Sequence, residues 1–290
     1  MFILLGCSFF LPLIVFVSWA NFQMKRRRNR VQDPFTERRL RLAGESAAKE
    51  YIAHSEKLLE FVYWLIAPPA VACAALGFGK VHTWVEAIPL FLLVVIVKVV
   101  LAARLRGHVK RLRAYRLGAE GERVVGDTLA RELLPKGYSI YHDFILNPGY
   151  EKKPFNIDHI VVGPSGVFAV ETKARSKLRD RKRAEVSRSG ESLDFGAFRD
   201  EKAIPQARRS AEQLAKFLGS CLPDGTTVEW CVVVPGWWSL GNPSETQVMN
   251  HRMLSNFIQR RRDSVLSEHD CRVIATMIEE ANRIEPVDTD

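Results

Sequence analysis

The first third of the chain alternates long apolar runs with short basic clusters. Phe2–Phe22 contains no charged residue, Phe61–Gly79 is equally apolar, and Val85–Ala103 carries charge only at Glu86 and Lys98. Each run has about the length of ~20 residues that a membrane-spanning helix needs. The pattern therefore predicts three transmembrane helices, one within residues 1–24 and a helical hairpin within residues 61–103.

Two basic clusters predict how these helices would be oriented. Lys25–Arg30 follows the first run, and Arg104–Arg116 follows the third without an acidic residue. Basic residues beside membrane spans stay on the cytoplasmic side. We therefore expect a multi-pass protein of the cell (inner) membrane, with the lipid bilayer as a partner, the amino terminus outside and the carboxyl-terminal domain in the cytoplasm. A soluble protein with buried apolar helices is the less favoured alternative.

From residue 118 onward the pattern changes to that of an α/β domain. Helical spacing predicts helices over residues 118–134, 203–219, 250–262 and 268–284, and β-rich apolar runs predict strands over 138–146, 157–162, 167–172 and 227–234. We expect a mixed sheet flanked by helices in a domain spanning 118–245, followed by carboxyl-terminal helices in 246–290. Residues 25–60 and 104–117 are interpreted as basic linkers, the first partly helical.

The strands predicted at 157–162 and 167–172 form a central hairpin that brings candidate site residues together. Gly163-Pro164-Ser165-Gly166 has turn composition, and if Gly163 pairs with Gly166 the same register sets Asp158 opposite Glu171. Side chains opposed in this way lie roughly 5 Å apart at Cβ. Lys173 lies two residues beyond Glu171 and so falls on the same face. Two acids and one amine are therefore predicted at the open end of an otherwise apolar hairpin.

Two adjacent carboxylates repel each other unless a cation lies between them. Oxygen ligands of this kind suit Mg²⁺ or Mn²⁺, since Mg²⁺ keeps several waters and takes one or two protein carboxylates. A nearby lysine can position water or stabilise charge on a phosphoryl oxygen. The plain alternative is a strand end with ordinary salt-bridged charges.

Charge is unevenly distributed along the chain. The net charge is +9, but without the eleven basic residues of the two membrane-flanking clusters the rest of the chain holds 31 basic and 33 acidic residues. A third basic run, Ala174–Arg188, follows Lys173, and it is interpreted equally well as a solvated loop or as a surface that gathers nucleic-acid phosphates. The five cysteines contain no CxxC pair, which argues against a zinc site.

The order of these motifs resembles a known family. Asp158 followed by Glu171-Thr172-Lys173 is similar to the PD-(D/E)xK nuclease core, and the segment IDHIVVGPSGVFAVETKA resembles the hairpin of the nuclease-related domain (NERD). Upstream, Gly118–Glu122 matches the GxxGE helix start of that family, and downstream Pro205-Gln206 matches its proline-glutamine step. The resemblance extends roughly from Tyr115 to Val234.

The resemblance implies a restriction-endonuclease-like fold and adds two site residues. Glu122 becomes a third metal ligand beside Asp158 and Glu171, although dipole compensation at a helix start would also explain it. Gln206 becomes a residue that assists Lys173. The implied activity is Mg²⁺-dependent hydrolysis of nucleic acid, DNA processing in the first place, without sequence specificity.

A non-catalytic, membrane-tethered module that binds nucleic acid or protein is the alternative. The sequence identifies no protein partner.

Overall fold

The computed structural model of the protein describes residues 19, 22, 39–58, 84–146, 155–177, 184–261 and 265–284. The chain divides into two compact units. One unit takes in Met1–Thr36, Glu50–Ala114 and Val287–Asp290, and the other takes in Glu37–Lys49 and Tyr115–Pro286.

The first unit bears on the predicted membrane spans. Apart from residues 19 and 22, the apolar runs 2–22 and 61–79 lie outside the described residues, whereas the run 85–103 belongs to helix α3 (Trp84–Leu133). Among the residues that the structure describes, no helix combines the length and the apolar character needed to cross a membrane.

Helix α3 also corrects a predicted boundary. The sequence predicted a linker over 104–117 and a helix that starts at Gly118, but α3 runs without a break from Trp84 to Leu133. Residues 104–117, RLRGHVKRLRAYRL, are mostly Arg, Leu, Lys and Ala. These residues have high helix propensity, which outweighs the single helix-disfavouring residue Gly107.

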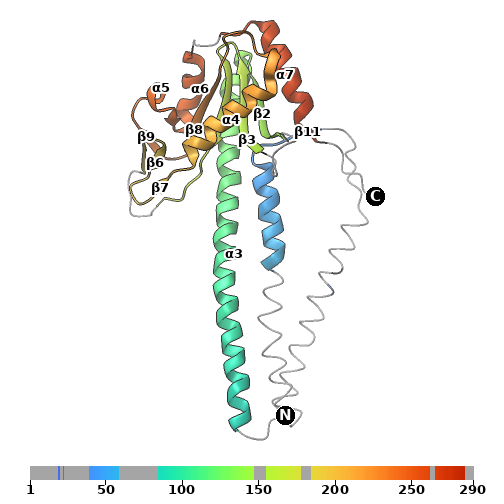
Figure 1. The fold of residues 1–290 in the computed structure, drawn as a ribbon, viewed down its shortest axis with the longest axis vertical. Coiled ribbons are helices and arrows are strands. Elements are labelled where there is room, and N and C mark those ends of the chain that lie inside the picture. The colour runs from blue at the N-terminus through green and yellow to red at the C-terminus, as the bar shows by residue number, and fades with distance from the viewer. Residues whose placement is uncertain are drawn as a thin grey trace. The chain divides into compact units, whose positions relative to one another are not determined.

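The main sheet of the second unit is mixed, as predicted (Figure 1). Strands β2, β3 and β4 are antiparallel, and β4, β8 and β10 are parallel. The hairpin register is confirmed, because Gly163 pairs with Gly166 and His159 with Val170. The sheet has the order β10-β8-β4-β3-β2, with β2 at Ser139–Leu146, β3 at Phe155–Gly163, β4 at Gly166–Thr172, β8 at Val228–Val233 and β10 at Val248–Met249.

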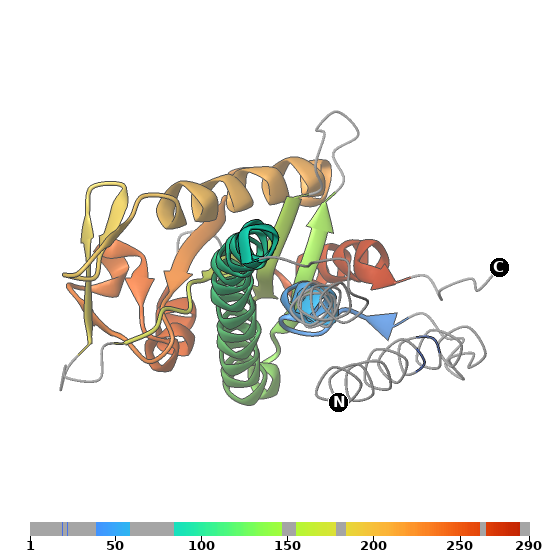
Figure 2. The ribbon, with the colours of Figure 1, turned by 90° about the horizontal axis from the view of Figure 1, so that it is seen from below.

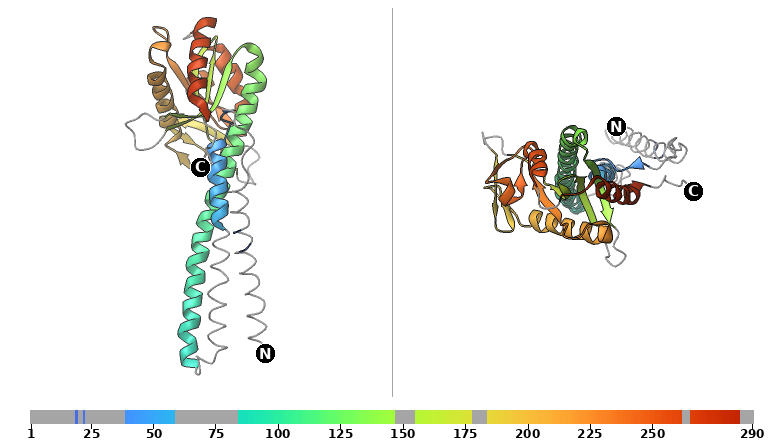
Figure 3. Two further views of the ribbon diagram at one scale, coloured as in Figure 1. Left: turned by 90° about the vertical axis from the view of Figure 1, so that its right-hand side faces the viewer. Right: turned by 90° about the horizontal axis from the view of Figure 1, so that it is seen from above.

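Helices cover both faces of this sheet (Figures 2 and 3). Helices α4 (Ala203–Leu218) and α7 (Glu268–Asn282) pack on the face formed by Ile160, Val162 and Ala169. The end of α3 and helix α6 (His251–Arg260) pack on the opposite face, which is formed by Val161, Phe168 and Val170. Every residue of β4 is buried, so this strand lies at the centre of the domain. Ser267 and Asp270 form a capping box at the start of α7.

A second, four-stranded sheet was missed by the sequence interpretation. Its order is β7-β6-β5-β9, with β5 at Glu185–Ser189, β6 at Ser192–Asp194, β7 at Arg199–Asp200 and β9 at Trp238–Leu240. These strands are short and mix charged with apolar residues, so they lack the long β-rich runs on which a strand prediction depends. The basic run Ala174–Arg188, interpreted either as a solvated loop or as a surface that gathers phosphates, thus ends in β5. Residues 178–183 within it lie outside the described residues.

A segment far upstream in the sequence docks on the domain. Strand β1 (Arg39–Leu40) pairs with β11 (Arg283–Ile284), and the residues that follow surround the buried carboxylate of Asp143. That carboxylate accepts hydrogen bonds from Arg41 at 3.2 Å, from Ser46 at 2.8 Å and from Asn156 at 2.9 Å. Asp143 has a left-handed backbone, with φ at 50°. The first predicted linker therefore contributes structure to the domain.

Removing the cation beside Asp143 should destabilise the domain. Arg41→Ala leaves a fully buried carboxylate without its charged donor, so we expect the free energy of unfolding to fall by about 1–3 kcal/mol. Arg39→Ala is a matched control, because Arg39 is 56% exposed and its partner Glu45 keeps a second ion pair with Lys49. This substitution should cost less than about 1 kcal/mol. Denaturant unfolding followed by tryptophan fluorescence measures both changes. Equal losses would contradict a structural role for Arg41.

Candidate active site

The predicted acids lie on one face of the hairpin. Side chains alternate along a strand, so Asp158 shares the face of Ile160 on β3, and Glu171 shares the face of Ala169 on β4. Both apolar residues belong to the cluster beneath α4 and α7. Asp158 and Glu171 are buried as well, at 8% and 1% exposed. The register therefore brings the two carboxylates to the same end of the same face.

Lys173 connects these acids to helix α4. Its Nζ donates to Oε1 of Glu171 at 2.5 Å and to Oε1 of Gln206 at 3.0 Å. Its backbone N–H donates to the carbonyl of Val233 at 2.9 Å, which continues the β4–β8 ladder by one residue. The lysine is thus fixed between a strand end and the first turns of a helix, where it contacts Gln206 directly.

Asp158 is fixed by the backbone of the neighbouring strand. Its Oδ2 accepts the N–H of Thr172 at 2.7 Å. Thr172 points to the other face, where its hydroxyl contacts His159 at 3.2 Å and His159 in turn contacts His142 at 2.8 Å. His159 therefore packs on the face opposite the acids and takes no part in the acid cluster.

Glu122 approaches the cluster from α3. A Cβ built on the preceding residue, Gly121, would lie 2.6 Å from Cβ of Ala174, so only glycine allows the helix to come this close to the end of β4. The N–H of Gly44, in the docked upstream segment, donates to the carboxylate of Glu122. Glu120 is different: its side chain is 54% exposed and pairs with Arg116. The helix therefore directs Glu122 inward and Glu120 outward.

The buried acids repel one another. Burial, together with repulsion from Asp158, Asp143 and Glu171, raises the pKa of Glu122 to about 9. Burial, together with Asp158, raises the pKa of Glu171 to about 8, even though Lys173 lowers it. The pKa of Asp158 is raised to about 6 by burial against the opposing effect of Lys173. Burial disfavours the charged form of Lys173, but Glu171 and Asp158 outweigh it and raise the pKa of this lysine.

The donor chemistry of this cluster fits a hard cation. Buried oxygens Oε2 of Glu122 and Oε2 of Glu171 have no hydrogen-bond partner. Oxygen donors that repel one another and lack partners are the groups that a divalent cation satisfies. Within the described ranges, no three His, Cys, Asp or Glu side chains form a group that could hold a metal ion. The fit therefore rests on the carboxylate pair of the hairpin, with Glu122 linked to it electrostatically.

Three groups near the site were not predicted from the sequence. Gly44 belongs to the segment near residue 40 that packs on the domain, and Asp143 accepts hydrogen bonds from that segment. A local sequence motif cannot predict a contact between residues so far apart in the chain. Asp200 accepts the N–H groups of Lys202 and Ala203 at the start of α4 and pairs with Arg175. Asp200 accepts the N–H groups two and three residues on, which is the bonding of an N-cap aspartate, so an Asp just before the predicted helix was a detectable signal.

The two glycines of the GxxGE motif should respond oppositely to substitution by alanine. A Cβ added at Gly118 would meet no neighbouring atom within 4 Å, whereas one added at Gly121 would meet Ala174. Gly118→Ala should raise the free energy of unfolding by up to about 1 kcal/mol, because alanine favours helix. Gly121→Ala should lower it by about 1–3 kcal/mol through overpacking. Thermal unfolding of both variants measures the changes, and changes of the same sign would contradict the close approach of α3 to β4.

Comparison with known proteins agrees with this geometry. Residues 117–235 match the family model of the nuclease-related domain, NERD, and the match includes all of the predicted site residues. No curated protein and no solved structure matches the chain. The matched segment covers less than half of the chain and runs from the end of α3 through β8. Residues 117–235 of this protein are therefore a nuclease-related domain.

Proposed function

We propose that the protein is a Mg²⁺- or Mn²⁺-dependent phosphodiesterase that hydrolyses nucleic acid. The observation that carries the proposal is the buried pair Asp158 and Glu171 on one face of the hairpin, with Nζ of Lys173 bonded to Glu171. A cluster of this kind is costly to bury. It becomes favourable when a cation and a phosphate complete its charge balance.

Asp158 and Glu171 would hold the cation, helped by the backbone carbonyl of Thr172 between Glu171 and Lys173. Glu122, the third ligand that the family resemblance implies, would act on the cation from α3. When bound, the cation would supply Lewis acidity toward a phosphoryl oxygen and neutralise charge that develops during in-line displacement.

The role of Lys173 follows from its contacts. Both groups that it touches, Oε1 of Glu171 and Oε1 of Gln206, are acceptors, so the amine is present as a donor. A donor held in this way orients the attacking water and stabilises negative charge on a phosphoryl oxygen. Gln206 holds Lys173 in place from α4, which limits the loss of side-chain freedom when substrate binds.

Substitution in this cluster should abolish metal-dependent cleavage. Lys173→Ala should lower the rate by about 10²–10³-fold, the cost of removing one donor to the transition state, and Asp158→Ala should lower it at least as much. Glu120→Gln is the matched control, since Glu120 lies two residues from Glu122 but is exposed. The assay uses the full-length protein, Mg²⁺ or Mn²⁺, and labelled single-stranded and duplex oligonucleotides.

A second readout separates binding of the cation from catalysis. Mg²⁺ should raise the thermal unfolding temperature of the parent and of Glu120→Gln, but not that of Asp158→Ala. Equal cleavage by the parent, Asp158→Ala and Lys173→Ala would indicate a contaminating nuclease and defeat the proposal. Nucleic-acid binding without any cleavage would instead favour a non-catalytic binding module.

We also propose that the protein is attached to the inner membrane, with the nuclease-related domain in the cytoplasm. The uncharged run Phe2–Phe22 and the cluster Lys25–Arg30 that follows it support this attachment. The exposed apolar side chains of α3 also support it, among them Phe91 at 68% and Val99 at 64% exposed. Large exposed apolar patches mark surfaces that bind lipid or another apolar surface.

Attachment predicts that alkaline carbonate leaves the full-length protein in the membrane pellet. Protease added to intact spheroplasts should leave the carboxyl-terminal domain whole, and digestion should occur only after the membrane is permeabilised. Release by carbonate would contradict membrane insertion. Digestion of the domain in intact spheroplasts would contradict the proposed orientation.

A further inference from the structure

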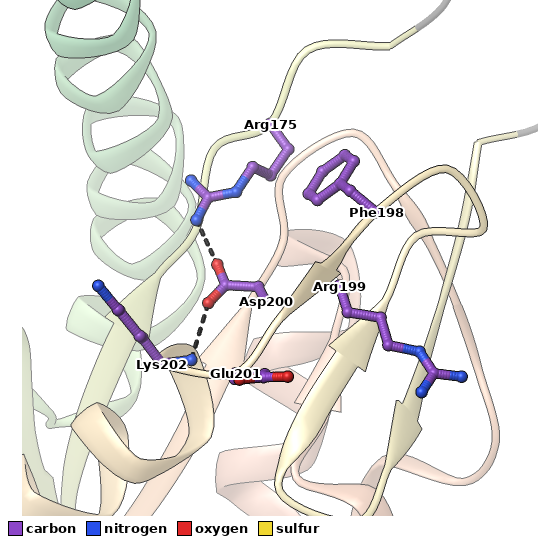
Figure 4. A pocket seen from close by; sticks show the side chains of 6 residues that line it. All are labelled: Arg175, Phe198, Arg199, Asp200, Glu201 and Lys202. Atoms are coloured by element: carbon purple, nitrogen blue, oxygen red, sulfur yellow. Dashed lines mark hydrogen bonds and ion pairs between the residues drawn. The ribbon is translucent and has the colours of Figure 1, made fainter.

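A pocket opens where the chain leaves the acid cluster. Its volume is about 290 Å³, near the lower end of the ~300–1,000 Å³ range of small-molecule sites. The residues that line it come from the segment after β4 and from the turn between β6 and α4 (Figure 4): Arg175, Phe198, Arg199, Asp200, Glu201 and Lys202.

One wall of the pocket is a preordered aromatic ring. Phe198 stacks on Phe195 with ring centroids 4.6 Å apart and planes inclined by 12°, and Phe195 packs edge-on against Trp237 at 4.8 Å. Phe195 and Trp237 are buried, whereas Phe198 is 41% exposed. Hydrogen bonds from the N–H of Phe195 to the carbonyl of Phe198 and from the N–H of Gly196 to Asp194 close the turn. One face of the Phe198 ring is thus supported and the other is open.

A fixed guanidinium lies beside this ring. Arg175 pairs with Asp200 and donates to the carbonyl of Ala174 at 3.1 Å, and its own carbonyl accepts the indole N–H of Trp237 at 2.9 Å. In Figure 4, Arg175 points toward Asp200 next to the Phe198 ring, while Arg199 extends away from Asp200. Two acids and three cations line the pocket, so its formal charge is only slightly positive. Electrostatic attraction alone would not retain a long polyanion here.

The pocket adjoins the proposed active site. Arg175 follows Lys173 by two residues, and Asp200 is close enough to act electrostatically on both Glu171 and Lys173. Asp200 also accepts backbone N–H groups at the start of α4, the helix that carries Gln206. A strand whose scissile phosphate lies at Lys173 therefore has its next nucleotide within reach of the pocket.

We propose that the pocket takes one unpaired base of a single-stranded nucleic acid, stacked on the open face of Phe198, with a flanking phosphate at Arg175 and Lys202. The position of the scissile phosphate rests on the proposed function, whereas the stacking does not. Paired bases inside a duplex are covered on both faces and have no free face for Phe198. The substrate is accordingly a single strand or an unpaired end, since aromatic platforms of this kind bind bases with little regard to sequence.

The experiment measures binding without cleavage. Full-length protein in EDTA is titrated with a labelled single-stranded oligonucleotide and with a covalently closed circular duplex, which has neither a loop of unpaired bases nor an end. Phe198→Ala should weaken binding to the single strand about 5- to 150-fold, the fold-change that corresponds to losing one stacked base. Phe198→Leu, which keeps the apolar contact with Phe195 but has no ring, should behave like Phe198→Ala, and Phe198→Tyr should bind like the parent.

Two further comparisons make the test specific. Trp238→Ala removes an aromatic side chain that is 63% exposed on β9 and does not line the pocket, so it should leave binding unchanged. The fluorescence of 2-aminopurine within the single strand should be quenched on binding to the parent and to Phe198→Tyr, but not on binding to Phe198→Leu. Binding of the closed duplex should be weaker than that of the single strand and insensitive to Phe198.

Failure of this proposal and failure of the proposed function give different results. Parental affinity in both Phe198→Ala and Phe198→Leu would overturn the stacking site, even if Mg²⁺-dependent cleavage is found. Absence of single-strand binding by the parent would overturn it as well. Loss of binding in these variants, with no cleavage under any metal condition, would retain the stacking site and reject the phosphodiesterase.

Discussion

The structure around the hairpin depends on the repulsion among buried carboxylates. Glu122, Asp158 and Glu171 act electrostatically on one another, and among the described residues Lys173 is the cation that contacts Glu171 directly. Without a cation, like charges in a desolvated place move apart or take up protons, which agrees with the raised pKa values of Glu122 and Glu171. Rigid neighbours hold each acid in place. The N–H of Thr172 donates to Asp158, and Glu171 belongs to β4, the strand at the centre of the domain. The close contact of Gly121 with Ala174 fixes the part of α3 that carries Glu122. A fixed group of acids of this kind is suited to bind a cation.

The start of α4 links this cluster to the aromatic pocket. Gln206 reaches back to Lys173, and Asp200, before the helix, binds both the helix N–H groups and Arg175. The second sheet then supplies the turn that carries Phe198, and its core residue Phe195 supports the ring. One helix start therefore fixes the position of the proposed catalytic amine relative to the proposed base platform, so a strand that meets both is held at a defined distance from the cation site.

The local sequence pattern was sufficient to predict the hairpin and its acids, but it did not predict the groups that surround them. The turn at Gly163–Gly166 fixes the register, and a period of two then determines the face of Asp158, Glu171 and Lys173. Glu122 was distinguished from Glu120 by family resemblance alone, because both occupy the same helical turn. The second sheet escaped prediction because its strands are short and polar, and the contact between Arg41 and Asp143 escaped because only tertiary structure joins residues so distant in sequence.

The contact between Arg41 and Asp143 shows that the domain includes residues from the amino-terminal part of the chain. The chain leaves the unit after Lys49 and returns at Tyr115. Gly44 packs against the backbone of Ala119, where a Cβ added to the glycine would lie 2.8 Å from the carbonyl oxygen. The intervening residues are therefore an insertion between two segments that meet beside Glu122, in contrast to a simple amino-terminal tether. The N–H of Gly44 donates to Glu122. A fragment that begins at residue 115 would therefore lose a bond to a proposed metal ligand, together with Arg41 and Ser46, two of the three donors to Asp143. The matched segment 117–235 is consequently smaller than the unit that positions the site.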